Sequence, residues 1–415
     1  MREAILYVLL ILVAAGAGVL LAMHMRQGRL QNQPIAASSS ATPPASRPAS
    51  TSAPVGAPAF PLHAAGKVSW PLFRGDALQQ GRAEGNLPDR LKLYWSRGLG
   101  GPTKSAPVLD EGRLFIGADD GKLHCLDAVT GRVLWEFDSG EAIEAAPAVA
   151  DGRVYFGNLD GRFFCLAATD GSKVWERPDK GKIVGSANLA GRGAAGSVLF
   201  GSYDNFLYCL AASDGSDRWA FQTSNYVNGC PALTERTAVF GGCDGKLHVV
   251  DLAAGQGVQE LDAGAYVAAS PAVEGQRAYV GNYQGGFSCF DIAGGKVRWQ
   301  VDRGSAFYAC PAVADGRVLA ACRDKRIYCL SAADGKELWN FAARGEVDCS
   351  PVVIGNRVLC GADDGRLYVL DLADGKTLWS YDLASAVKSC AAGDGVAIAV
   401  TEDGLVSAFG PAEKP

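Results

Sequence analysis

The sequence predicts an all-β protein: an eight-bladed β-propeller of four-stranded antiparallel blades. Three observations lead to this fold class. A phrase that ends in tryptophan, such as "LDLADGKTLW", recurs along the chain at a spacing of 40 residues. Each interval contains short β-rich runs separated by turn residues. The last interval lacks a tryptophan strand, whereas the first tryptophan strand has no interval before it.

The tryptophan register defines the repeat. The spacing is 40 residues except before Trp219, where it is 44, with the extra residues near the loop "AGRGAAGS". A buried indole removes about 150–250 Å² from water, and small residues such as Ala128 and Gly131 leave room for the ring. We interpret these tryptophans as structural docking residues, and Gln259 as a divergent copy. The docking residues are Trp95, Trp135, Trp175, Trp219, Trp299, Trp339 and Trp379.

Each unit is predicted to contain four short strands. In the first unit, "RLFIGA", "KLHCLD" and "RVLWEF" are rich in β-branched, leucine and aromatic residues, and "DEG", "DDG" and "VTG" supply turn residues between strands. No helical pattern of useful length appears among these repeats. Four strands in 40 residues are typical of a propeller blade.

The two ends of the repeat region complement each other. After Trp379, "KSCAAGDGVAIAVTEDGLVSAFG" supplies three strands, and "LKLYWSRGL" around Trp95 supplies a fourth. We therefore expect the amino-terminal strand to complete the last blade, which leaves no open sheet edge in the ring. The propeller is predicted to span residues 91–410, followed by a tail at 411–415.

The amino-terminal part predicts a membrane anchor and a tether. Residues 4–23 are twenty apolar residues without a charge, enough to span a hydrocarbon core of about 30 Å. We expect an uncleaved signal anchor within residues 1–30, with a cleaved signal as the alternative. Residues 31–66 are rich in Pro, Ala and Ser and predict a linker, and residues 67–90 form a lead-in segment. We expect the propeller to be periplasmic or otherwise extracytoplasmic, although the flanking charges leave the orientation open.

The composition argues against one class of partner. The net charge is -5, with 39 basic and 44 acidic residues, so the chain lacks the cationic surface that binds nucleic acid.

The repeat resembles a known family. The order Ala, Gly, Trp within each phrase is similar to the tryptophan-docking repeat of PQQ-like, or quinoprotein alcohol dehydrogenase-like, eight-bladed propellers, and "WPLFRGD" (Trp70–Asp76) is similar to their lead-in. This resemblance implies one of two functions. One branch contains dehydrogenases that bind pyrroloquinoline quinone and calcium. The other includes an accessory lipoprotein of outer-membrane β-barrel assembly and lacks the cofactor.

The sequence favours the cofactor-free branch. No two cysteines are adjacent, which excludes the vicinal disulfide of some quinoprotein alcohol dehydrogenases, and the units lack long insertions. We therefore expect no quinone, no calcium and no catalysis. The lipid-attachment cysteine of the lipoprotein is also absent, so the resemblance concerns the scaffold and not the anchoring.

Most of the twelve cysteines follow the repeat. One register position alternates with Val and Ala and predicts buried, inert thiols; it holds Cys125, Cys165, Cys209, Cys289 and Cys329. Cys230, Cys310 and Cys390 share a second position with Ala and Ser. Cys243 and Cys322 lie across a hairpin from Cys230 and Cys310, so one or two disulfides are open alternatives in an oxidising compartment. No cysteine or histidine spacing indicates zinc.

Other polar residues have structural interpretations. His124 and His248 occupy a strand position that Phe or Tyr fills in other units, and we do not expect a catalytic pair. The doublets Asp119–Asp120 and Asp363–Asp364 precede glycine and predict turns, with a calcium site as the alternative.

A variable position before each innermost strand is the candidate site. It is expected to converge around the mouth of the central channel, and several loop aromatics and an arginine are expected on the same face. Tyr and Arg are enriched in protein interfaces, although an ordinary solvated loop face would also vary. The position holds Lys104, Glu144, Val184, Asn228, Ala268, Tyr308, Asp348 and Lys388, and the loop residues are Tyr203, Tyr226, Tyr266, Tyr283, Phe307 and Arg323.

These features predict a monomeric, membrane-tethered propeller that binds envelope or membrane proteins. A quinone-dependent dehydrogenase and a sensor that binds a small ligand at the channel mouth are the alternatives.

Overall fold

The computed structural model describes residues 68–178 and 181–412. The predicted anchor, the linker and the last three residues lie outside this part of the chain. Within it, no helix has both the length and the apolar character needed to cross a membrane.

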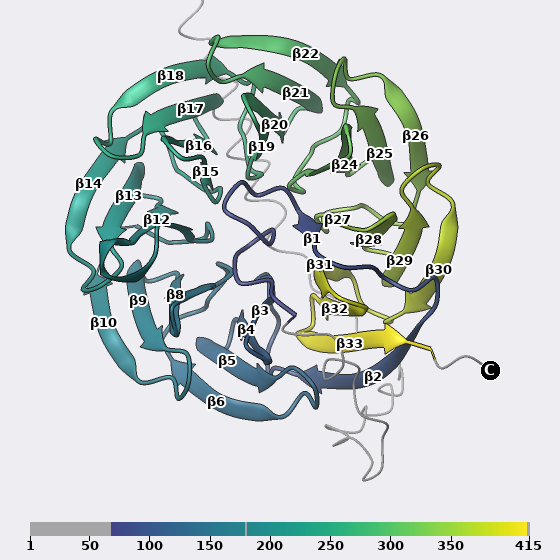
Figure 1. Ribbon diagram of the computed structural model, residues 1–415, viewed down its shortest axis with the longest axis horizontal. Coiled ribbons are helices and arrows are strands. Elements are labelled where there is room, and N and C mark those ends of the chain that lie inside the picture. Colours follow the sequence, from purple (N-terminus) through teal and green to yellow (C-terminus); the bar gives the residue numbers. More distant parts are fainter. Residues whose placement is uncertain (1–67, 179–180, 413–415) are drawn as a thin grey trace, which may run out of the picture. The chain divides into compact units, whose positions relative to one another are not determined.

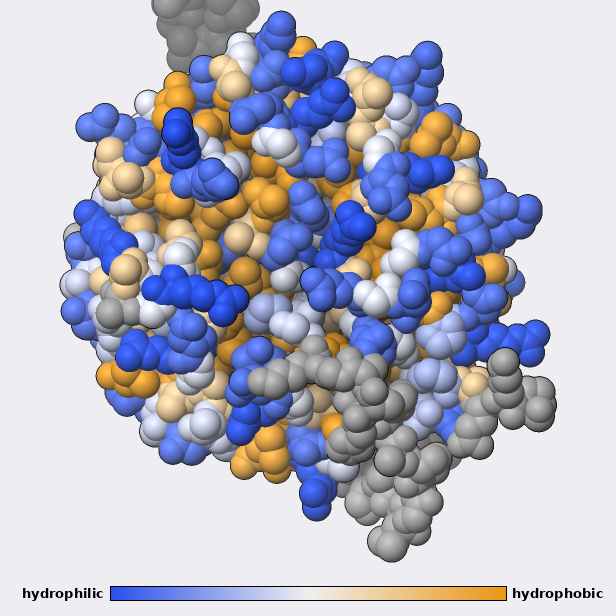
Figure 2. Space-filling view, viewed as in Figure 1, coloured by the Kyte–Doolittle hydropathy of each residue, from blue (hydrophilic) through white to orange (hydrophobic). Residues whose placement is uncertain are grey.

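Eight four-stranded antiparallel sheets are arranged in a ring, which confirms the predicted propeller (Figure 1). The three inner strands of a blade are almost fully buried, because both faces of the sheet pack against neighbouring blades. The outermost strand is exposed at alternate residues, as in β6 (Val133–Asp138). In the view of Figure 2, hydrophilic and hydrophobic side chains are interspersed over the surface of the ring.

The first four blades follow one another along the chain. Blade 1 contains β3 (Val108–Asp110), β4 (Arg113–Gly117), β5 (Lys122–Asp127) and β6. Blade 2 contains β7 (Ala148–Ala150), β8 (Arg153–Gly157), β9 (Arg162–Ala167) and β10 (Lys173–Pro178). Blade 3 contains β11 (Asn188–Ala190), β12 (Ser197–Gly201), β13 (Phe206–Ala211) and β14 (Asp217–Gln222). Blade 4 contains β15 (Ala232–Leu233), β16 (Thr237–Gly241), β17 (Lys246–Asp251) and β18 (Gly257–Asp262). The longer connection in blade 3 holds a short 3-10 helix, Gly193–Ala195.

The remaining blades complete the ring. Blade 5 contains β19 (Ala272–Glu274), β20 (Arg277–Gly281), β21 (Gly286–Asp291) and β22 (Lys296–Asp302). Blade 6 contains β23 (Ala312–Ala314), β24 (Arg317–Cys322), β25 (Arg326–Ser331) and β26 (Glu337–Ala342). Blade 7 contains β27 (Val352–Ile354), β28 (Arg357–Gly361), β29 (Arg366–Asp371) and β30 (Thr377–Asp382). Blade 8 contains β31 (Val387–Gly393), β32 (Val396–Thr401), β33 (Leu405–Pro411) and the amino-terminal β2 (Leu91–Gly98).

The ring closes as the sequence predicts. Strand β2 pairs antiparallel with β33, and Trp95 lies opposite Ala408 in this register. One strand was not predicted: β1 (Arg82–Ala83) pairs in parallel with β27 on the inner edge of blade 7.

The tryptophans dock on the following blade. Trp95 Nε1 donates a hydrogen bond to the carbonyl of Ala128 at 3.1 Å, and Trp339 Nε1 donates to the carbonyl of Leu372 at 3.0 Å. The indole covers a glycine so closely that a Cβ added to Gly131 would lie 2.5 Å from Trp95 Cε3. Gln259 occupies the same place, because a Cβ on Gly295 would lie 2.8 Å from its Oε1. The amide therefore covers the glycine that an indole covers in the other blades.

We predict that Gly375→Ala destabilises the propeller more than Gly316→Ala. Both glycines have a φ of +72°, so both variants strain the backbone by about 1–2 kcal/mol. At Gly375 a Cβ would also lie 2.5 Å from the Trp339 ring, whereas no other atom of the described residues would lie within 4 Å of a Cβ at Gly316. Overpacking adds about 1–3 kcal/mol. Denaturant unfolding of both variants measures the difference, and equal losses would contradict close indole docking.

Buried thiols pack inside the blades. Cys125 lies opposite Trp135 in the pairing of β5 with β6, and its side chain is fully buried. Burial raises the pKa of Cys125, Cys165 and Cys329 to about 12, from an ordinary value of 9.0. These thiols are therefore neutral core residues at physiological pH.

We predict that alkaline pH destabilises the fold through these thiols. Since their pKa is higher in the folded chain, the folded state keeps protons that the unfolded state releases. The free energy of unfolding therefore falls as the pH rises from about 9 to about 12. Unfolding measured across this range should show a weaker dependence in Cys125→Val. The reverse change, Val249→Cys at the same register position, should strengthen it.

Candidate functional site

The lead-in segment, residues 68–90, closes one end of the central channel. It crosses the middle of the ring (Figure 1) and runs past the inner strand of each blade in turn. Its carbonyls accept backbone N–H groups that the inner strands would otherwise leave unpaired. The pairs, each written as the N–H donor followed by the residue whose carbonyl accepts, are Leu109 to Trp70 (2.9 Å), Val149 to Pro71 (2.8 Å), Leu233 to Ala77 (2.6 Å), Val273 to Leu78 (2.9 Å), Val313 to Gln80 (2.8 Å), Val353 to Gly81 (2.9 Å) and Asp394 to Glu84 (3.2 Å). Trp70 N also donates to the carbonyl of Leu109, at 2.8 Å.

Blade 3 contacts the lead-in segment through the side chain of Asn188 and not through a backbone N–H group. Asn188 Nδ2 donates to the carbonyls of Ala77, at 2.9 Å, and of Pro231, at 2.8 Å. The lead-in segment therefore contacts all eight blades.

Arg74 is buried at the centre of this segment. Its residue is only 3% exposed and its backbone has a φ of 64°. Its Nη2 donates to the carbonyls of Pro351, at 2.5 Å, and Pro311, at 3.2 Å. Burial lowers the pKa of Arg74, and no carboxylate among the described residues forms an ion pair with it. Gly81 is required beside it, because a Cβ there would lie 1.9 Å from Nη2.

A cavity of about 210 Å³ lies above this floor. All eight variable positions predicted at the channel mouth line it, together with Trp70, Phe73 and Arg74 of the lead-in segment. Between them lies a belt of small residues at one register position. The belt residues are Ala106, Ala146, Ser186, Cys230, Ser270, Cys310, Ser350 and Cys390.

The belt joins consecutive blades. Cys230 N donates to Ser270 Oγ at 2.8 Å, and Ser270 N donates to Cys310 Sγ at 3.2 Å. Similar bonds join Ala146 N to Ser186 Oγ at 3.0 Å and Cys310 N to Ser350 Oγ at 2.9 Å. Small side chains with an acceptor atom fit this position, which explains why Ser and Cys interchange there.

The two hairpin disulfides considered from the sequence are not formed, because all twelve cysteines are free thiols. Their sulfur atoms have other partners. Cys243 Sγ accepts a hydrogen bond from Asn228 Nδ2 at 3.1 Å, and Cys322 Sγ donates to the carbonyl of Ser305 at 3.3 Å. The two histidines of the repeats, His124 and His248, occupy equivalent buried positions beside carboxylates. His124 Nδ1 lies 3.1 Å from Glu136, and His248 Nε2 lies 2.9 Å from Asp244.

Charged groups at the mouth are paired with one another. Arg323 binds Asp348 through two hydrogen bonds of 2.8 Å, and its guanidinium lies 3.8 Å from the centre of the Tyr308 ring. Burial, followed by the hydrogen bond with Tyr283, raises the pKa of Tyr308 to about 12. Lys104 Nζ lies 2.5 Å from Glu144, and Lys388 Nζ lies 2.8 Å from Asp363.

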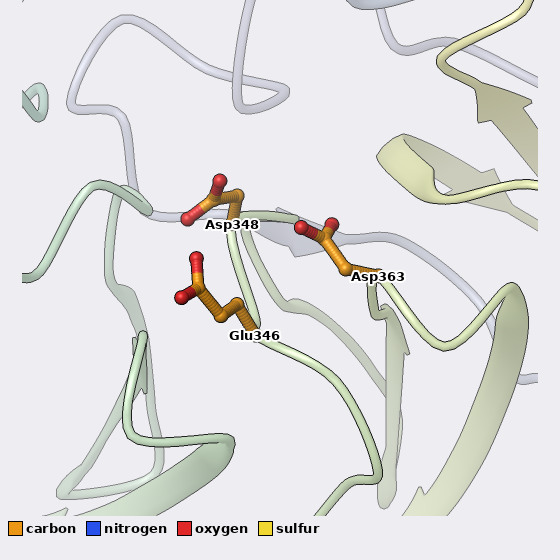
Figure 3. A group of neighbouring side chains, drawn as sticks. All are labelled: Glu346, Asp348 and Asp363. Atoms are coloured by element: carbon orange, nitrogen blue, oxygen red, sulfur yellow. The ribbon is translucent and has the colours of Figure 1, made fainter. Parts of the chain in front are cut away.

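Three carboxylates at the mouth are close enough to share a cation. The ligand atoms of Glu346, Asp348 and Asp363 lie within 4.8 Å of one another (Figure 3). Arg323 pairs with Glu346 and Asp348, and Lys388 pairs with Asp363, so all three carboxylates have a cationic partner. These two cations offset most of the charge of the trio, and of the three carboxylates only Asp348 lines the cavity.

Tyrosines form an exposed part of the same face. Tyr203 and Tyr226 stack with ring centres 4.5 Å apart, and Tyr283 packs edge-on against Tyr308 at 5.4 Å. Tyr226, Tyr266 and Tyr283 are 44%, 57% and 52% exposed. We call these three residues the tyrosine rim.

Phe307 does not belong to this surface, contrary to the sequence-based expectation. It is 1% exposed and covers Gly281, where a Cβ would lie 2.2 Å from its own. Ile143, Val227 and Val267 fill the same register position in other blades and cover Gly117, Gly201 and Gly241. Phe307 is therefore a core residue.

A groove of about 970 Å³ runs between blades 4 and 5 beside the tyrosine rim. Tyr266 and Tyr283 line it, together with Asp244, Glu260 and Asp262 and one cation, Lys246. Lys246 pairs with Glu260, so the groove keeps an acidic balance.

Sequence reasoning missed the lead-in segment as the floor of the cavity and Arg74 as its buried cation. Two signals pointed there. The stretch from residue 67 to 90 is too short for a blade, and "WPLFRGD" places an arginine between aromatic residues and a glycine.

This architecture defines a class: closed eight-bladed propellers with docked tryptophans and an internal lead-in segment. The family model described as outer membrane protein assembly factor BamB matches residues 79–219, 192–308 and 288–413. The chain therefore belongs to this family.

Solved structures share the fold. BamB from Moraxella catarrhalis is 19% identical, with a TM-score of 0.67 over 79% of this chain and 99% of that one. Quinohemoprotein alcohol dehydrogenase from Comamonas testosteroni is 14% identical, with a TM-score of 0.71 over 84% of this chain and 82% of that one. The computationally designed Ika8 protein is 20% identical, with a TM-score of 0.68 over 76% and 98%. A comparison with curated proteins returned no match.

We predict that Gly81→Ala loosens the inner edge of the ring. The added Cβ displaces Arg74 and the carbonyls that hold Val313 and Val353. Hydrogen exchange in β23 and β27 should become roughly ten- to hundredfold faster, which corresponds to about 1.4–2.8 kcal/mol of local stability. Gly112→Ala is the matched control, since the φ of Gly112 is +76° and no atom in the described part of the chain would lie within 4 Å of the added Cβ. Unchanged exchange in Gly81→Ala would show that the lead-in segment does not stabilise these strands.

Proposed function

We propose that this propeller is a non-catalytic scaffold that binds partner proteins of a bacterial envelope complex through its tyrosine rim. The observation that carries the proposal is the exposure of Tyr226, Tyr266 and Tyr283 on one face, each near half of its surface. Exposed aromatic rings held by neighbouring packing lose little conformational freedom on binding, and they are frequent energetic centres of interfaces.

The groove beside the rim suggests the chemistry of the partner. Its acidic balance and its two tyrosine walls suit a partner segment that carries Arg or Lys next to apolar residues. Charge complementarity of this kind selects partners and speeds association. We propose that the partner places such a segment between blades 4 and 5.

The anchor and linker would set the position of the ring. Residues 4–23 would hold the chain in the membrane, and the 36 residues of the linker give a root-mean-square reach of roughly 30–36 Å if flexible. We propose that the ring lies on the extracytoplasmic side as a monomer. Protease added to intact cells with a permeabilised outer membrane tests this, because a cytoplasmic ring would survive.

We predict that a photo-crosslinking amino acid at position 266 traps a partner in intact membranes. The same amino acid at position 258 is the control, because Val258 is 53% exposed on the outer strand of the same blade. Adducts of one defined mass should form from position 266 and not from position 258. Tyr283→Ala should weaken the trapped complex by about 2 kcal/mol, a loss of roughly thirtyfold in affinity. Equal adducts from both positions, or none, would contradict a specific interface at the rim.

A quinoprotein dehydrogenase remains the rival function, supported by the shared fold of the alcohol dehydrogenase. Incubation with pyrroloquinoline quinone and calcium, followed by dye-linked turnover of alcohols, distinguishes the two. Turnover that depends on the quinone would overturn the scaffold proposal.

A further inference from the structure

Three thiols meet below the mouth of the cavity, where blade 7 adjoins blade 8. Cys349 precedes β27, Cys360 lies in β28 and Cys390 lies in β31. The Sγ atoms of Cys349 and Cys390 are 3.4 Å apart. Cys360 Sγ donates to the carbonyl of Cys349 at 3.2 Å. The three residues are 0%, 0% and 6% exposed.

This junction differs from the other blade junctions. Cys390 is the belt residue of blade 8, yet its sulfur contacts a second sulfur instead of continuing the pattern of Ser270 and Ser350. The partner, Cys349, stands where Ala269 and Ala309 occur in blades 5 and 6. Two thiols therefore face each other across the inner edges of two blades.

The environment favours reaction at Cys349. The charge of Arg74 acts on Cys349 and Cys360, and Arg74 Nη2 binds the carbonyl of Pro351 close by. Hydrogen bonds from Cys360 and then Cys390 lower the pKa of Cys349 well below its usual value. The thiolate is the nucleophilic form of cysteine.

The cavity gives a small oxidant access to this pair. Cys390 lines the cavity, whereas Cys349 lies behind it and Cys360 is enclosed by the strands of blade 7. A peroxide molecule in the cavity therefore reaches the pair at Cys390, whose sulfur lies 3.4 Å from that of Cys349.

We propose that Cys349 and Cys390 form a redox-active disulfide that joins blades 7 and 8. With hydrogen peroxide as the two-electron oxidant, its O–O bond breaks as one oxygen is transferred to Cys349 Sγ and one water leaves. The sulfur of Cys390 then attacks the sulfenic acid, the S–O bond breaks, and a second water leaves. Two thiols and one peroxide give one disulfide and two waters. The sulfur atoms need to approach by about 1.4 Å to reach the usual S–S length.

The bond would join two blades that follow each other in the chain. It would leave the pairing of β2 with β33, which closes the ring, noncovalent. The loop that the disulfide closes runs from residue 349 to residue 390 and contains the whole of blade 7. The inference is independent of the proposed binding function.

The test uses the full-length chain, purified in detergent with reductant and then treated with hydrogen peroxide. Remaining thiols are blocked in denaturant, and peptides are mapped by mass spectrometry without reduction. We expect a cross-linked pair that contains Cys349 and Cys390, with a loss of about 2 Da for two hydrogen atoms. The oxidised protein should also have a higher Tm than the reduced protein, and dithiothreitol should restore both the mass and the Tm.

Three variants make the assignment specific. Cys390→Ser should abolish the cross-link, whereas Cys360→Ser should keep it. Cys125→Ser removes a buried thiol in blade 1 and should also keep the cross-link. A disulfide between Cys349 and Cys360, or oxidation of the wild-type chain to sulfinic acids without any cross-link, would overturn the proposal. Because the wild-type chain is mapped directly, this outcome does not depend on the folding of a variant.

Discussion

The pairing of β2 with β33 is the contact on which the rest of the structure depends. Seven blades are continuous in sequence and could exist as an open stack of sheets. Only this antiparallel pair converts the stack into a ring, and only a ring brings positions that are 40 residues apart to face one another around an axis. The cavity, the belt and the mouth are consequences of that closure.

Closure creates a second problem that the lead-in segment solves. Eight inner strands turn their unpaired edges toward the axis, and a narrow channel leaves little room for water to satisfy each N–H group. The segment that precedes β2 passes these edges one after another and accepts their hydrogen bonds. Its small residues let the chain turn in this confined space. The same segment carries Arg74 into the axis, where peptide carbonyls and thiols surround the guanidinium.

The sequence predicted those features that repeat. The repeat register appears eight times, and it predicts the number of blades, the strand positions, the docked tryptophans and the closing strand. Where one copy of the repeat is ambiguous, the other copies indicate the correct assignment. The lead-in segment appears once, and no periodicity could reveal that its carbonyls face the axis. Phe307 was misplaced because an aromatic residue next to Tyr308 suggested a surface cluster, whereas its register matches Ile143 and Val267 of the core. The contact of Cys349 with Cys390 was missed because Cys349 lies outside both cysteine registers. Ion pairs such as Arg323 with Asp348 join different loops, and only coordinates bring them together.

The path of the lead-in segment also determines how the ring would respond to mechanical load. A pulling force applied from the amino-terminal side reaches Val68 first. It then acts in turn on each hydrogen bond between the lead-in segment and the inner strands. Strand β2 lies behind these contacts in the chain, and its pairing with β33 carries no load until they have given way. The floor of the cavity thus shields the closing blade from force, and a pulled ring would open at its centre before its circumference yields.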